Sequence, residues 1–170
     1  MINALNLVIK LQNRPWVDKD IEEHLERLFK YFDQNYHEFS SFEKWKKQVE
    51  RKNLAWSPVH TEKFWQTCFI FFHEAENLAC INILIEILQH PSRGPDSDAI
   101  DQKKAIACYD LGEFARFFPL GRNYLEQRNA KAFIAQLMSD PSSSPELKKE
   151  AITCYQKLLM NSWGMGGVAQ

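Results

Sequence analysis

The sequence predicts an all-α fold of the armadillo/HEAT-like helical-repeat type, and three observations support that prediction. Apolar residues recur at the spacing of a helix face along almost the whole chain, which is typical of amphipathic helices. The chain has 170 residues but only 6 glycines, and no segment alternates convincingly between apolar and polar residues, which argues against a β-sandwich with many tight turns. Two short segments also repeat each other further along the chain.

Four helices are predicted in the first half of the chain. The first is long, and its apolar stripe runs through Ile21, Leu25, Leu28, Phe32, Tyr36 and Phe39. Ser40 and Glu43 have the spacing of a capping box, which predicts a separate second helix over about 41–52. A third helix is predicted over about 61–72. The fourth, over about 76–90, is apolar nearly all round, so we expect it at the centre of the fold.

The second half alternates between helices and proline-containing loops. Residues 91–98 (PSRGPDSD) are the most loop-like stretch of the chain. The segments predicted after it are a helix over about 99–118, short helices over 120–127 and 130–138, a loop over 140–145 and a last helix over about 145–163. The glycine-rich residues 164–167 are expected to fray.

The internal repeat sets the predicted domain organisation. Residues 105–109 (AIACY) resemble residues 151–155 (AITCY), and each segment follows an apolar helix that ends in a proline-containing loop. A period of about 40–47 residues with two or three helices is typical of HEAT and armadillo arrays. We therefore expect a single domain over 1–170, with a helical N-terminal cap over 1–75, about two armadillo-like units over 76–163 and a frayed tail over 164–170.

Composition and charge exclude several classes of protein. Lys and Arg number 21 against 22 Asp and Glu, so a net charge of −1 gives no general attraction to nucleic acid or to an anionic membrane. No apolar run approaches the roughly 20 residues of a membrane span, and residues 1–12 lack the features of a signal peptide. The four cysteines lie far apart, which indicates buried thiols in a reducing, cytosolic compartment.

No recognised catalytic motif occurs, so we expect neither an enzyme nor a cofactor. Ser41 and Lys44 match the bare S-x-x-K of penicillin-recognising enzymes, but the other two elements of that family are missing, and Ser41 is better explained as a helix cap. The five histidines are too scattered for a metal site. An enzyme of unfamiliar type, using His60 or Cys68, remains an alternative.

A basic cluster with one aromatic residue is the only indication of nucleic-acid binding. It consists of Lys44, Lys46, Lys47, Arg51 and Lys52, with Trp45 among them. Trp45 shares the apolar stripe of Phe42 and Val49 and should face inward, so no nucleic-acid partner is expected. A contact with an acidic protein, or a solvated surface, is the preferred interpretation.

Three stretches of the sequence together carry a family resemblance. They are Arg14–Ile21 followed by Ser40–Glu43, Leu54–His60 followed by Phe64 and Trp65, and Tyr109–Arg116 followed by Pro119 and Gly121. In this order and spacing they resemble the C-terminal domain of the H subunit of the eukaryotic vacuolar-type proton-pumping ATPase, from about Lys10 to Trp163. Residues 128–131 depart from the family's Gly-Gly-Lys turn, although Asn129 tolerates the left-handed geometry such a turn needs. Residues 68–72 are more apolar than the family usually shows.

The resemblance implies a non-catalytic regulator on the cytosolic face of vacuolar or endosomal membranes. Such a domain supports coupled ATP hydrolysis in the assembled pump and inhibits the detached catalytic sector. Its expected partners are the catalytic hexamer (through a B subunit), the central rotor, the peripheral stalk, the cytosolic part of the large membrane subunit, and the N-terminal domain of the H subunit.

The resemblance also points to a contact loop. The family's inhibitory contact aligns with residues 91–99, so the candidate partner-binding residues are Pro91, Ser92, Arg93, Gly94, Pro95, Asp96, Ser97 and Asp98. The main alternative is a generic helical-repeat adaptor that binds a peptide or helix of another protein. Inhibition of ATP hydrolysis by the detached sector would distinguish the two.

Overall fold

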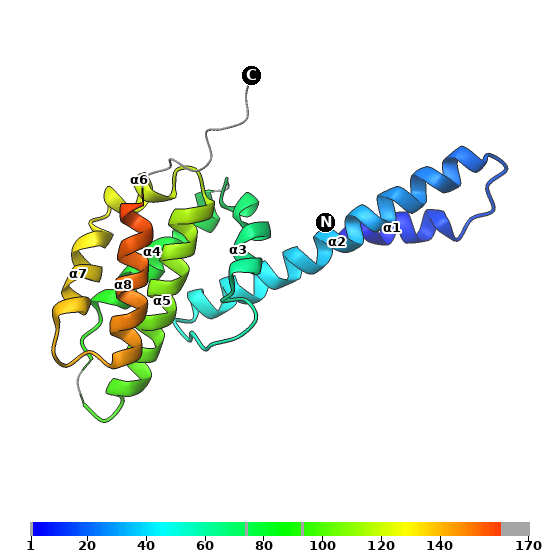
Figure 1. Ribbon diagram of the computed structural model, residues 1–170. Coiled ribbons are helices and arrows are strands. Elements are labelled where there is room, and N and C mark those ends of the chain that lie inside the picture. Colours follow the sequence, from blue (N-terminus) through cyan, green and yellow to red (C-terminus); the bar gives the residue numbers. More distant parts are fainter. Residues whose placement is uncertain (1, 74, 93, 161–170) are drawn as a thin grey trace, which may run out of the picture. The chain divides into compact units, whose positions relative to one another are not determined.

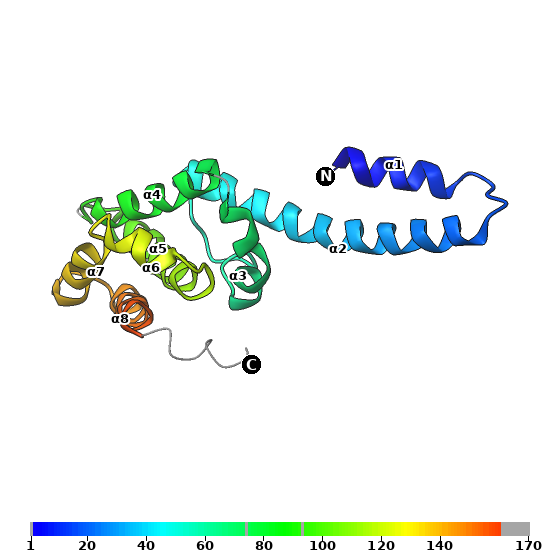
Figure 2. The ribbon, with the colours of Figure 1, turned by 90° about the horizontal axis from the view of Figure 1, so that it is seen from above.

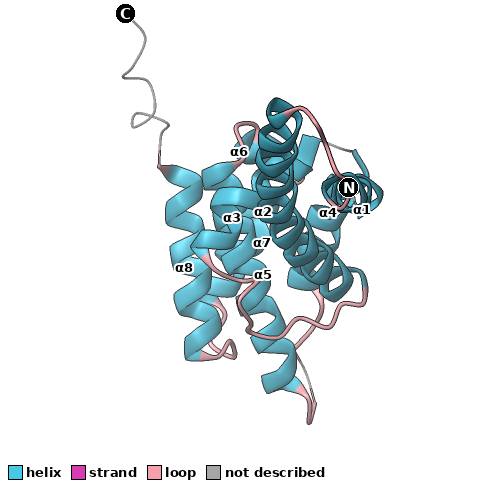
Figure 3. Cartoon of the chain, turned by 90° about the vertical axis from the view of Figure 1, so that its right-hand side faces the viewer, coloured by secondary structure: helices cyan, strands magenta, loops and turns pink. Residues whose placement is uncertain are grey.

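The computed structural model describes residues 2–73, 75–92 and 94–160. Within these ranges the chain contains helices joined by loops and no strand, so the all-α prediction is confirmed (Figure 3). The elements are α1 (Ile2–Gln12), α2 (Lys19–Glu50), α3 (Glu62–Cys68), the 3-10 helix η1 (Phe69–His73), α4 (Ala75–Gln89), α5 (Ser97–Phe117), α6 (Gly121–Glu126), α7 (Ala130–Ser139) and α8 (Pro145–Leu159).

The chain forms two compact units, Met1–Glu43 and Lys44–Gln170. In the first unit, α1 is folded back along the start of α2 (Figure 2), and Val8 and Leu25 are buried. The sequence interpretation did not predict α1. Ile21 and Leu28 of the predicted apolar stripe are exposed. The side chains of its other three members, at positions 32, 36 and 39, lie outside the described residues.

The prediction of two helices over 19–52 was wrong, because α2 is one continuous helix from Lys19 to Glu50. No glycine or proline occurs in that range, so the backbone has no reason to stop at Ser40. The helix ends where Lys52 adopts a left-handed φ of 51°. The amide N of Asn53 then donates to the carbonyl O of Gln48 at 3.0 Å, as is common at a helix C-terminus.

The second unit is built around two stacked helix pairs, α4 with α5 and α7 with α8. Helix α5 packs on α8 and α4 packs on α7, while the short α6 joins the pairs (Figure 1). Helix α4 is central as predicted, since Ile81, Leu84 and Ile85 are buried. This arrangement is the helix-on-helix stacking of a repeat protein, in which each pair covers the apolar face of its neighbour.

Aromatic rings fill the interior beside these pairs. Trp45 is fully buried, which confirms its predicted inward orientation. Its ring meets those of Trp65 and Phe72 edge-on at 5.4 and 5.5 Å between centroids. Phe72 in turn lies 5.2 Å from Phe114 of α5. Such edge-to-face pairs each add about 0.5–1.5 kcal/mol beyond burial.

The remaining boundaries lie close to their predicted positions. The predicted third helix divides into α3 and the 3-10 helix η1, and α5 begins two residues earlier than expected. Residues 161–163 of the last predicted helix and the glycines predicted to fray lie outside the described residues. No helix in the described ranges combines the length and apolarity needed to cross a bilayer.

Candidate partner-binding loop and the network that holds it

The predicted contact residues connect α4 to α5. Pro91, Gly94, Pro95 and Asp96 are exposed, and Ser92 is half-buried. Arg93 lies outside the described residues. Ser97 and Asp98 do not belong to the loop as predicted, because they form the first turn of α5. The exposed turn is therefore shorter than the sequence indicated.

Local geometry makes the turn compact. Gly94 has φ 91°, and a Cβ there would meet nothing within 4 Å, so backbone conformation rather than space calls for glycine. The amide N of Ser97 donates to the carbonyl O of Gly94 at 3.2 Å, and that of Ile100 donates to the carbonyl O of Asp96 at 3.0 Å. Because Pro95 also has a fixed φ, little conformational entropy remains to be lost when a partner binds.

A buried carboxylate organises the residues that carry the family resemblance. Asp110 of α5 is fully buried and accepts three side-chain hydrogen bonds. Trp45 Nε1 donates to its Oδ2 at 2.8 Å, and Trp65 Nε1 donates to its Oδ1 at 3.2 Å. The third donor is His60 Nδ1, 2.9 Å from Oδ2. We call Trp45, His60, Trp65 and Asp110 the Asp110 network; it joins α2, the segment before α3, α3 itself and α5.

His60 has the orienting carboxylate that a general base requires, which sequence reasoning missed because Asp110 lies 50 residues away. Its other ring nitrogen, Nε2, lies 3.1 Å from Gln48 Oε1. The side chain of His60 is fully buried, so both nitrogens are engaged within the protein. The geometry supports a structural role for His60.

A second polar contact lies where α5 meets α8. Lys157 Nζ is 2.6 Å from Glu113 Oε1, and both side chains are largely buried. At the residue directly before Glu113, a Cβ on Gly112 would lie 3.2 Å from Cys154 Cα, so the two helix backbones approach closely here. The Gly112 and Glu113 pair of the family-like segment therefore sets the spacing and the register of α5 against α8.

The cysteines are packing residues, as predicted. Cys68, Cys80, Cys108 and Cys154 are all buried. Burial raises the pKa of the Cys154 thiol to about 12 and that of Cys108 well above its usual range. Thiolate chemistry is therefore suppressed at these two positions near neutral pH. Among the described residues, no group of three or more His, Cys, Asp or Glu is arranged to hold a metal ion.

Two lysines of the basic cluster are engaged by neighbouring side chains, one of them by a carboxylate. Lys46 Nζ donates to Asn77 Oδ1 at 3.1 Å, and Lys52 pairs with Glu86 at 2.9 Å. Trp45, the one ring available for base stacking, is buried in the Asp110 network. This geometry disfavours the nucleic-acid interpretation.

Comparison with known proteins identifies the family. A family model that describes the H subunit of the V-ATPase matches residues 38–163. The chain belongs to the family of V-ATPase H subunits. The match covers the C-terminal part of α2 and every helix after it, including the whole Asp110 network.

Relatives in the family of V-ATPase H subunits occur in distant eukaryotes. The V-type proton ATPase H subunit of Drosophila melanogaster is 31% identical over 154 residues, covering 90% of this chain and 31% of the relative. A probable V-type proton ATPase H subunit of Oryza sativa subsp. japonica is 31% identical, covering 92% and 33%. The H subunit of Dictyostelium discoideum is 30% identical, covering 96% and 33%. The chain spans about a third of the length of these relatives, and it corresponds to the C-terminal domain of the H subunit.

Proposed function

We propose that this chain is a non-catalytic regulatory domain of the vacuolar-type proton-pumping ATPase. In this proposal it supports coupled ATP hydrolysis in the assembled pump and inhibits ATP hydrolysis by the detached catalytic sector. The family match supports the assignment to the pump, since the relatives are described as proton ATPase subunits. The domain works at the cytosolic face of vacuolar or endosomal membranes, attached through the other pump subunits.

The observation that carries the inhibitory role is the exposed turn between α4 and α5. A compact projection held by two stacked helix pairs presents Gly94, Pro95 and Asp96 to a partner with little entropy left to lose. In our proposal this turn contacts the catalytic hexamer, through a B subunit, near the central rotor. In the assembled pump the domain instead lies near the peripheral stalk and the cytosolic part of the large membrane subunit, with the N-terminal domain of the H subunit beside it.

Switching between these two positions needs only a difference in affinity. A domain with two sets of partners occupies whichever docked state has the lower free energy. Moving the population from about 1:99 to 99:1 requires about 5.5 kcal/mol of differential binding. Detachment of the catalytic sector removes one set of contacts and thereby supplies such a difference.

The test is an ATP hydrolysis assay on the detached catalytic sector with added chain. The wild-type chain should lower the rate, and a variant carrying Pro95→Ala and Asp96→Asn should inhibit less while unfolding at the same temperature. A matched control, Pro119→Ala with Glu76→Gln, changes exposed residues elsewhere and should inhibit like wild type. Undiminished inhibition by the turn variant would overturn the contact assignment. Binding without inhibition would favour the adaptor alternative.

A further inference from the structure

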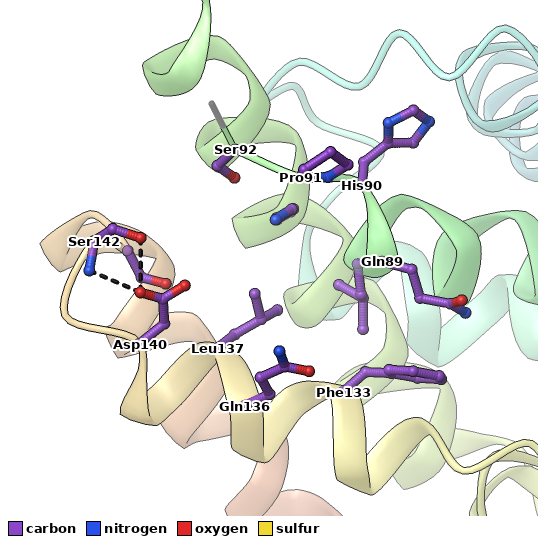
Figure 4. Close-up of a pocket in the computed structure, with 12 residues that line it drawn as sticks. Gln89, His90, Pro91, Ser92, Phe133, Gln136, Leu137, Asp140 and Ser142 are labelled. Carbon is purple, nitrogen blue, oxygen red and sulfur yellow. Dashed lines mark hydrogen bonds between the residues drawn. The ribbon is translucent and has the colours of Figure 1, made fainter. Parts of the chain in front are cut away.

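A pocket of about 610 Å³ lies within the second unit, on the side where the helix pairs present their loops. Its lining includes His90 and Ser92 from the segment after α4, Lys104 from α5, and Leu137 from α7. The loop between α7 and α8 contributes Asp140. Figure 4 shows Pro91 and Ser92 across the pocket from Gln136 and Leu137.

The notable lining residue is Lys104, which is only 4% exposed. It forms no hydrogen bond and no ion pair with any residue that the structure describes. Its aliphatic stem is buried, but its Nζ is not among the buried side-chain atoms that lack a hydrogen-bond partner, so the ammonium faces the open space of the pocket. Lys104 therefore presents a cation to the pocket without a direct hydrogen bond or ion pair, although the charges of Asp101 and Asp140 act on it.

Each neighbouring carboxylate accepts hydrogen bonds from other groups, but Asp101 Oδ1 is buried and has no hydrogen-bond partner among the described residues. Asp101 Oδ2 accepts a hydrogen bond from the amide N of Ser144 at 2.7 Å. Asp140 Oδ1 accepts two hydrogen bonds from Ser142, from its amide N at 2.8 Å and its Oγ at 2.6 Å. Burial lowers the pKa of Lys104, although the charges of Asp101 and Asp140 act in the opposite direction.

A second unsatisfied group lies in the same pocket. Ser92 Oγ is buried and has no hydrogen-bond partner among the described residues. A hydroxyl left in this way loses the hydration it had in the unfolded chain without replacement. One missing cation partner and one missing hydrogen-bond partner in a single pocket indicate a binding site for an anionic oxygen.

The lining also selects among anions. Lys104 is the only lysine or arginine among the described lining residues, and Asp140 adds a negative charge. A phosphate with about two charges prefers several cations or an arginine fork, whereas a single carboxylate is balanced by one lysine. Leu88, Phe133 and Leu137 provide apolar walls for an aliphatic stem. The volume is that of a typical ligand pocket and exceeds one side chain, so neighbouring residues of a peptide fit as well.

We propose that this pocket receives a peptide segment of a partner protein through one acidic side chain, whose carboxylate pairs with Lys104 and accepts a hydrogen bond from Ser92 Oγ. This goes beyond the proposed function, because it assigns a different surface with a stated chemistry. It does not depend on inhibition of the pump.

The experiment uses the full chain and arrays of nine-residue peptides with blocked ends. One array fixes a central glutamate between varied apolar residues, and matched arrays carry glutamine or phosphoserine at the centre. The best glutamate peptide should bind about tenfold or more tightly than its glutamine match, as expected for a buried charge-assisted contact. When this peptide is added, the changes in the amide chemical shifts of the chain should cluster around residues 88–92, 104 and 133–143.

Substitution of Lys104 tests whether its charge is responsible for peptide binding. Lys104→Met should weaken the glutamate peptide by about tenfold or more and leave the glutamine peptide unaffected. Lys103→Met, on the same helix but outside the pocket lining, is the matched control and should bind like wild type. Should Lys104→Met fail to fold, the glutamate and glutamine comparison on the wild-type chain decides the question.

Three results would overturn the proposal. They are equal binding of glutamate and glutamine peptides, absence of binding across the whole glutamate array, and preference for the phosphoserine array or for inorganic phosphate. Loss of inhibition in the ATPase assay, with peptide binding intact, would count against the proposed function alone. Failed peptide binding with intact inhibition would count against the pocket alone.

Discussion

Helix α5 carries two buried charged residues with opposite surroundings. Asp110 is fully buried, and its two oxygens accept from three donors in the Asp110 network. Lys104, less than two turns earlier on the same helix, is 4% exposed and forms no hydrogen bond or ion pair with the described residues. The fold thus satisfies one charge completely and leaves the other open.

The contrast shows that the contribution of a charged side chain to the fold depends on its hydrogen-bond and ion-pair partners. A fully partnered group specifies how surrounding elements meet, and removing it leaves its donors without partners. A charged group without a hydrogen bond or ion pair does little to hold elements together, and it is available to a ligand or partner. Asp110 belongs to the first class and Lys104 to the second.

Opposite effects on stability are the strongest test of this comparison. Asp110→Ala should lower the free energy of unfolding by about 3–5 kcal/mol, because two indoles and one imidazole lose their acceptor in the interior. Lys104→Met should leave it unchanged or raise it, since a lysine without a hydrogen bond or ion pair is replaced by an apolar chain of similar length that keeps the buried stem. Urea unfolding followed by circular dichroism measures both.

The exposed carboxylate of Asp98 provides a control for the loss of the Asp110 carboxylate. Asp98→Asn removes an exposed carboxylate from the first turn of α5 and should cost less than about 1 kcal/mol. Equal destabilisation by Asp110→Ala and Lys104→Met would contradict the distinction between the two charges.

The close approach of α5 and α8 gives the next largest effect. Gly112→Ala should destabilise by about 1–3 kcal/mol, because the new Cβ would lie 3.2 Å from Cys154 Cα and 3.1 Å from Lys157 Cδ. Helix propensity alone would favour alanine by up to about 1 kcal/mol, so the sign separates overpacking from propensity. Gln102→Ala, at an exposed position of α5, should be nearly neutral in the same thermal unfolding measurement.

The buried thiol of Cys154 extends the comparison to a group that stays neutral. Its pKa is raised to about 12 in the folded chain, above the ordinary value near 9. The folded state therefore keeps a proton that the unfolded state loses, and Cys154 alone lowers stability by about 1.4 kcal/mol per pH unit as pH rises from about 9 to about 12. Cys154→Ala should remove this share of the slope and leave that of Cys108, while Ile152→Ala at an exposed site should keep both. Unfolding free energies between pH 8 and 11 would measure the slopes, and a slope unchanged by Cys154→Ala would contradict the shift.

The smallest effect is expected where a charge pair is exposed. Lys52 and Glu86 lie 2.9 Å apart with about half of each side chain accessible. Glu86→Gln should therefore change the free energy of unfolding by less than about 1 kcal/mol, and by still less in 0.5 M salt. A loss comparable to that of Asp110→Ala would show that burial does not govern these energies.

Periodicity was enough to predict most helices of the second unit. The apolar faces of α4, α5 and α8 repeat at helical spacing, and prolines or glycines mark the loops between them. The capping-box signal at Ser40 failed because such spacing also occurs by chance inside a helix without breakers. Helix α1 was not predicted, because the apolar residues at positions 1–12 were interpreted only as a possible signal peptide.

The site was only partly predictable. The sequence identified the loop after α4, although the first turn of α5 begins inside the range it gave. It identified His60, Trp65 and Asp110 as motif residues and Trp45 as an inward-facing ring. It did not connect them, because the three donors lie 45 to 65 residues from Asp110. The pocket around Lys104 left no local signal, since an absent partner becomes visible only when all neighbours are placed.

The contact at Gly112 has a mechanical consequence. Helices that meet at backbone distance have no pliable side-chain layer between them, and close-packed interiors transmit strain with little compression. The Asp110 network also links α3 and the end of α2 to the same helix. A force applied to the turn at Gly94–Asp96 is therefore transmitted along α5 to α8 with little deformation of the packed helices.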